Sequence, residues 1–137
     1  MAEFLTELTL ENLDDKYWKL IQSLLYKSDI LQCVVEIPFN FITDLASVPR
    51  IPIAYWFWGG RVHREAVLHD YLYRIDSIPV VSFSIANKVF LEAMKARGKT
   101  FYVRYPMYTG VVIGGQSSYH KKEVFYESMQ ALFGAGK

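Results

Sequence analysis

The side chains best able to do chemistry in this chain are gathered in residues 66–73, where a histidine and an aspartate are adjacent. The helical spacing of this region predicts a helix over 62–75 that places His69, Asp70 and Tyr73 on one face. Histidine has an unperturbed pKa of about 6.5, so His69 could take a proton from water near neutral pH. Asp70 could bind a hard cation such as calcium, which collects about 6 to 8 oxygen ligands.

A calcium site at Asp70 would need a second carboxylate, and the nearest candidate upstream is Asp44. This residue lies in a segment rich in Thr, Ser and Pro, where irregular backbone leaves carbonyl groups available as ligands. A structural interpretation stays open for each residue. A helical histidine beside an aspartate is more often a hydrogen-bonded tether, and an aspartate in such a loop often only caps a turn.

Two helices joined by a tight turn are predicted to position these side chains. The second helix spans 83–98, with Ser82 or Ser84 as its N-cap and a glycine at its end. His69 lies about six residues before the turn, and Asn87 lies about as far into the returning helix. Antiparallel packing should therefore bring these two side chains level with each other.

The whole chain is predicted to form one α+β domain. Residues 1–38 should be mainly β, because alternating apolar residues over 4–10 and β-branched residues over 31–37 predict strands of a small antiparallel meander. Residues 39–61 should form a loop rich in proline and aromatic residues, and 62–137 should be mainly helical. Two further helices are predicted, over 101–113 and 119–133.

Composition excludes several classes of protein. The 137 residues include 15 Lys and Arg against 14 Asp and Glu, so the net charge of +1 lacks the basic excess that nucleic-acid binding requires. Cys33 is the only cysteine, which excludes an internal disulfide. The most apolar stretch, residues 51–60, is too short to span a bilayer and contains a proline, so no transmembrane segment is expected.

Three segments together resemble a domain-of-unknown-function family that is common in tailed bacteriophages and prophages. These segments are residues 43–50, 66–73 and 86–94, and the likeness extends over roughly 35–115. The resemblance implies a bacteriophage-encoded protein that is expressed in the host cytoplasm, where it could also become part of the virion. It implies no particular activity.

The same elements are similar, through fewer residues, to the phospholipase A2 superfamily, in which a His-Asp-x-x-Tyr helix follows a calcium-binding loop. This similarity implies that His69 is the general base that activates water. It implies that Tyr73 hydrogen-bonds to the residue that orients the histidine. It also assigns calcium to Asp70, Asp44 and the carbonyl group of Leu45, where the ion would polarise the ester carbonyl.

Asn87 stands where the superfamily has the carboxylate that orients the histidine. An asparagine can accept a hydrogen bond from the imidazole and fix its tautomer, but it cannot stabilise the imidazolium that forms during catalysis. The chain departs from the superfamily in two other ways. It cannot form the disulfides of secreted members, and it has Leu45, Ala46 and Ser47 where those members have a glycine-rich calcium loop.

Three functions are therefore open. The first is a phospholipase A2-like, calcium-dependent lipid ester hydrolase that is weak or has lost turnover. The second is a virion or tail component in which the polar helix face is a rigid core, and the third is an accessory protein that binds a host factor. Four consecutive aromatic residues are predicted to contact a phospholipid surface or other phage structural proteins. They are Tyr55, Trp56, Phe57 and Trp58.

Overall fold

The computed structural model describes residues 1–13, 17–43, 63–114 and 119. Within these residues the fold is α+β, as predicted, with short strands first along the chain and helices after them. The strands form two antiparallel sheets rather than one meander. The first sheet has the order β1 (Glu3–Phe4), β4 (Leu24–Ser28), β5 (Cys33–Ile37), and the second has the order β2 (Leu10–Asn12), β3 (Trp18–Leu20), β6 (Ile42–Thr43).

The predicted continuous strand over 4–10 is wrong, because Thr6 interrupts the pairing with β4. Its hydroxyl accepts a hydrogen bond from the Leu25 N–H at 3.0 Å and donates one to the Ser23 carbonyl at 3.2 Å. A side chain thus replaces the backbone as the partner of β4, and the chain leaves the first sheet to pair as β2 in the second. β6 also corrects the sequence prediction, because it lies inside the range 39–61 that was expected to be loop.

The predicted antiparallel helix pair is confirmed by α2 (His63–Leu72) and α3 (Phe83–Ala96). Ser82 is the N-cap of α3, since its hydroxyl accepts the Ile85 N–H at 3.1 Å. The chain leaves α3 through Gly98, whose φ of 77° is in the left-handed region that glycine adopts without strain. α2 ends three residues earlier than predicted, in a turn in which the Arg74 N–H bonds the Tyr71 carbonyl.

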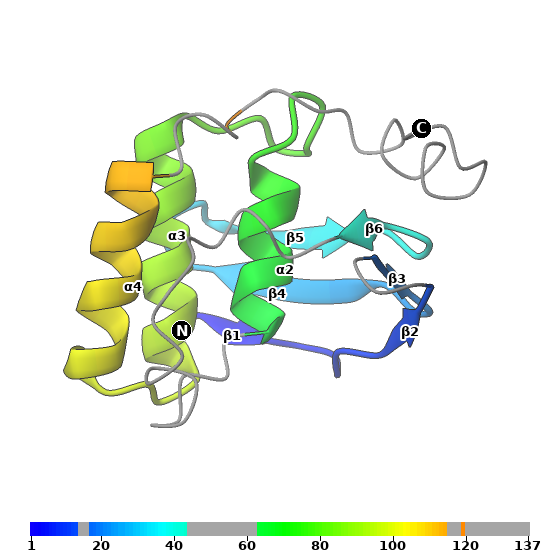
Figure 1. Cartoon of the computed structure of the whole chain (residues 1–137), viewed down its shortest axis with the longest axis horizontal. Coiled ribbons are helices and arrows are strands. Elements are labelled where there is room, and N and C mark those ends of the chain that lie inside the picture. The colour runs from blue at the N-terminus through cyan, green and yellow to red at the C-terminus, as the bar shows by residue number, and fades with distance from the viewer. Residues whose placement is uncertain (14–16, 44–62, 115–118, 120–137) are drawn as a thin grey trace.

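The main core lies between the first sheet and the helix pair. Figure 1 shows α2 in front of β4 and β5, with α3 beside it and α4 (Phe101–Gly114) on the outer side of α3. Every residue of α2 from Glu65 to Leu72 is buried, including the polar ones. This burial decides the chemistry of the helix, because His69, Glu65 and Asp70 are removed from water.

Glu92 of α3 ties the first sheet to the helices. Its carboxylate accepts hydrogen bonds from the Tyr26 hydroxyl at 2.7 Å, the Ser28 hydroxyl at 2.8 Å and the Ile30 N–H at 2.9 Å. The first two donors alternate along β4 and share its buried face. One carboxylate therefore holds both the strand and the turn that follows it.

α4 confirms the helix predicted over 101–113, and it continues through Pro106. Met107 and Val111 pack against α3, whereas Phe101 and Ile113 are 66% and 79% exposed. Among the helices that the structure describes, none is long and apolar enough to cross a membrane. The predicted helix over 119–133, apart from Tyr119, and the four aromatic residues from Tyr55 to Trp58 lie outside the described residues.

Candidate functional site

The structure brings together three of the predicted site residues: His69 from α2, Tyr73 from the turn directly after α2, and Asn87 from α3. The Nε2 atom of His69 lies 2.8 Å from Oδ1 of Asn87, and the Tyr73 hydroxyl donates to the same Oδ1 atom at 2.7 Å. The predicted alignment of His69 with Asn87 is thus confirmed, as is the predicted hydrogen bond from Tyr73 to the orienting residue. The catalytic roles of these residues stay predictions.

These contacts define which nitrogen of the imidazole carries the proton. The amide oxygen of Asn87 can only accept hydrogen bonds, so Nε2 of His69 is the protonated nitrogen and Nδ1 keeps its lone pair. Among the residues that the structure describes, Nδ1 has no hydrogen-bond partner. The site therefore presents a neutral imidazole with one nitrogen oriented and the other able to accept a proton.

Burial makes His69 a much weaker base than a histidine in water. The imidazole packs between the rings of Tyr73 and Phe90, with centroid distances of 4.0 and 4.8 Å, and the residue has no exposed surface. Removal from water lowers the pKa of His69 to about 4, while the hydrogen bond to Asn87 opposes this by a smaller amount. The expectation that His69 titrates near its ordinary value is therefore wrong, because the sequence does not show its burial.

Tyr73 is held as a hydrogen-bond donor. Burial raises the pKa of its phenol, and the contact with Asn87 offsets only part of this effect, so the hydroxyl keeps its proton. The ring of Tyr119 meets that of Tyr73 edge to face at 5.5 Å, and its own hydroxyl bonds the Val81 carbonyl. Tyr119 thus holds the start of α3 against the end of α2, although the sequence contained no signal for this contact.

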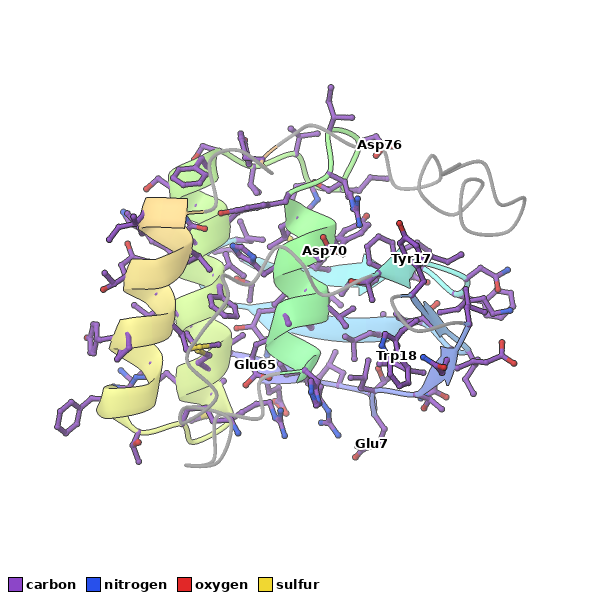
Figure 2. All side chains as sticks on the ribbon, viewed as in Figure 1. Glu7, Tyr17, Trp18, Glu65, Asp70 and Asp76 are labelled. Carbon is purple, nitrogen blue, oxygen red and sulfur yellow. The ribbon has the colours of Figure 1, made fainter. Side chains whose placement is uncertain are left out.

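Asp70 belongs to a second cluster that does not include His69. Its Oδ2 atom accepts hydrogen bonds from the Thr43 hydroxyl at 2.5 Å and from Nη2 of Arg74 at 2.8 Å. Figure 2 labels Asp70 on α2, and Thr43 reaches it from β6. The predicted calcium partners Asp44 and Leu45 lie outside the described residues, so Asp70 is the one member of that set that the structure places.

Sequence reasoning missed Arg74 and Thr43 as partners of Asp70. Arg74 lies four residues after Asp70, a spacing that favours an ion pair on a helix, so this contact could have been predicted. Thr43 is 27 residues away and carried no such signal. Among the described residues, no group of three or more His, Cys, Asp or Glu side chains could hold a metal ion.

A second buried acid, Glu65, lies at the other end of α2, as Figure 2 shows. Its Oε1 atom accepts a hydrogen bond from Nη1 of Arg97 at 3.0 Å, just beyond the end of α3. Burial raises the pKa of Glu65 more than the nearby Arg97 lowers it. This pair joins the open ends of the helix hairpin and takes no part in the His69 cluster.

A groove of about 720 Å³ lies beside the N-terminus of the chain, and neither His69 nor Asp70 lines it. It is lined by α3, α4 and the turn after β4, with Lys88, Lys95 and Arg104 among its side chains. Because none of the predicted site residues lines it, the groove and the His69 cluster are separate features.

A family model described as "Protein of unknown function (DUF1353)" matches residues 18–111, which is more than two thirds of the chain. The match begins at β3 and ends in α4, so it includes both helices of the His69 cluster. No match to the chain is found among curated proteins or solved structures.

Proposed function

We propose a function for this chain, which belongs to the DUF1353 family of proteins of unknown function: a lipid ester hydrolase of the phospholipase A2 type with slow turnover. One observation supports it above the others. Asn87 accepts hydrogen bonds from both His69 and Tyr73 through one oxygen atom, which fixes the imidazole with Nδ1 as its basic nitrogen. A base oriented through its other nitrogen is the arrangement that general-base catalysis requires.

In the proposed reaction a water molecule loses a proton to Nδ1 of His69 while its oxygen adds to the ester carbonyl carbon. The proton then passes from the imidazolium to the departing alkoxide, so the base is regenerated. Asn87 holds the imidazole in place but carries no charge, and burial disfavours the imidazolium. Both effects raise the barrier to proton transfer, which is why we propose slow turnover.

The test is release of fatty acid from vesicles of mixed anionic and zwitterionic phospholipids. We expect slow release by the wild type and none by His69→Gln. The matched control is His63→Gln, which replaces an exposed histidine at the start of the same helix and should leave the rate unchanged. Release that is equal in the wild type and His69→Gln would show that His69 is not the base.

Asn87→Asp is the sharper variant. A carboxylate in contact with Nε2 stabilises the imidazolium, so the rate of fatty-acid release should rise by about tenfold or more. The same carboxylate raises the pKa of His69. As the pH is lowered, the variant should therefore lose activity at a higher pH than the wild type. Wild-type activity should continue until the pH approaches 4, the value that burial gives to the pKa of His69. Circular dichroism checks that the variant is folded, because a buried charge can destabilise the native state.

A second candidate is a non-enzymatic bacteriophage protein, either a virion or tail component or an accessory protein that binds a host factor. It is favoured by the neutral Asn87 and by the ion pair of Asp70 with Arg74, because both contacts give buried polar residues of α2 a structural partner inside the protein. The exposed apolar residues of α4 offer a surface for such a contact. Wild type and Asn87→Asp that are both folded and both inert on vesicles would favour this candidate.

Bacteriophage origin and expression in the host cytoplasm are part of both proposals. Their support is the resemblance of the segments around Asp44 and His69 to phage and prophage sequences. The calcium requirement implied by the phospholipase resemblance stays a prediction. Asp70 is the described residue of that predicted calcium site, and the structure pairs its carboxylate with Arg74.

A further inference from the structure

The carboxylate of Asp70 already has a cation beside it, supplied by the same helix. Nη2 of Arg74 lies 2.8 Å from Oδ2 of Asp70, and the two side chains are only 3% and 7% exposed. The Thr43 hydroxyl donates to the same oxygen atom at 2.5 Å. A pair so removed from water is screened little by solvent, so its charges interact strongly.

Arg74 is held in place from several directions. Its guanidinium lies over the ring of Phe41, 5.3 Å from the ring centroid, which is a favourable position for a cation. Phe41 is itself fully buried and meets Tyr71 edge to face at 5.7 Å. The N–H of Arg74 bonds the Tyr71 carbonyl in the turn after α2. The positive charge is therefore part of the core.

We propose that the guanidinium of Arg74 takes the place of the calcium ion at Asp70, so that the folded protein is complete without a divalent cation. The inference depends on the proposed function only in that the phospholipase resemblance puts calcium at Asp70. A divalent ion bound to this carboxylate would lie close to the guanidinium, and the two like charges would repel each other. Calcium ligation at Asp70 thus requires Arg74 to leave a buried position.

The first measurement is the melting temperature of the wild-type chain in millimolar calcium, in magnesium and in chelator at matched ionic strength. We expect the three values to agree, because a ligand stabilises a protein only if it binds the native state. A rise that is specific to calcium and is lost in Asp70→Asn would overturn the proposal. This measurement needs no variant of Arg74, so it holds even where such variants fold poorly.

The second measurement uses Arg74→Gln, which removes the guanidinium beside Asp70. Its melting temperature should fall, and calcium should restore about 3 °C or more, the size expected when calcium exceeds its dissociation constant about tenfold. The double variant Arg74→Gln/Asp70→Asn should show no response to calcium. Arg74→Lys keeps the charge and should also show none. A folded Arg74→Gln that ignores calcium would contradict the replacement.

These experiments separate the inference from the proposed hydrolase, because their readout is stability rather than turnover. A chain that is inert on vesicles, but in which Arg74→Gln gains a calcium response, would refute the hydrolase and support the replacement. A wild-type chain that is active on vesicles and is stabilised by calcium through Asp70 would support the hydrolase and refute the replacement.

Discussion

Replacing His69 with glutamine should remove a defined part of the pH dependence of folding. The pKa of His69 is lowered from 6.5 to about 4 in the folded protein, mainly by burial. A group whose pKa falls on folding contributes its full stability above its unfolded pKa and loses it as the pH drops toward the folded value. The contribution of His69 is therefore complete above pH 6.5 and disappears between 6.5 and about 4.

The size of this effect follows from the gap between the two pKa values. At about 1.4 kcal/mol per pH unit, the neutral imidazole contributes about 3 kcal/mol near neutral pH. Glutamine does not titrate, and its amide can still donate to Asn87. The wild type and His69→Gln differ in their free energy of unfolding. This difference should consequently fall by about 3 kcal/mol when the pH is lowered from neutral to 4.

The assay is chemical denaturation of both proteins at a series of pH values, with His63→Gln as the control for loss of an exposed histidine. Carboxylates elsewhere in the chain titrate in the same pH range. Comparing the two proteins at each pH removes their contribution to the free energy of unfolding. A free-energy difference between the wild type and His69→Gln that stays constant across the series would refute the argument. In that case the imidazole would be able to bind a proton in the folded state.

Three other substitutions test the packing and the buried acids. Phe90→Ala should cost about 3 to 5 kcal/mol in a denaturation experiment, because Phe90 is fully buried between α2 and α4, whereas Phe101→Ala on the exposed face should cost little. Glu92→Gln should cost about 2 to 4 kcal/mol by the same measurement, since three donors lose a charged acceptor, and exposed Glu36→Gln is its control. Glu65→Gln should lower the free energy of unfolding less at pH 7 than at pH 5. The pKa of the Glu65 carboxyl is raised in the folded protein, so the wild type becomes more stable relative to the variant as the acid is protonated. An equal loss of stability at both pH values would contradict this.

The helix pair could be predicted from the sequence because its signals are local. Ser82 at the start of α3 and Gly98 beyond its end are caps that act within a few residues. The connection over residues 73–82 then returns the chain so that α3 runs back along α2, which sets His69 level with Asn87. Local rules also indicated α4, where the helical pattern outweighed Pro106.

The division of the strands could not be predicted from alternation alone. The pattern over 4–10 is continuous, and the break at Thr6 depends on Leu25 and Ser23, which are 19 and 17 residues away. Propensity describes a residue and its neighbours, while the choice between two sheets depends on distant partners.

The chemistry of the site was predictable in its residues but not in its electrostatics. His69 and Tyr73 were identified by type and spacing, and Asn87 was identified through the phospholipase A2 resemblance. The low pKa of His69 comes from burial on every side, which sequence periodicity does not reveal. Arg74, which forms an ion pair with Asp70, lies only four positions away, yet the burial of that pair depends on Phe41 and Thr43 from the β part of the chain.

Glu92 has a consequence for the way the molecule opens. The donors that it binds lie 62 to 66 residues upstream, in β4 and the turn after it, so they can be satisfied only when α3 is docked. The Ile30 amide is in a surface turn, where amide hydrogens normally exchange quickly with solvent. Its hydrogen can exchange only after the Glu92 contact breaks. The exchange rate of this one peripheral amide therefore reports how often the Glu92 contact between α3 and the first sheet opens.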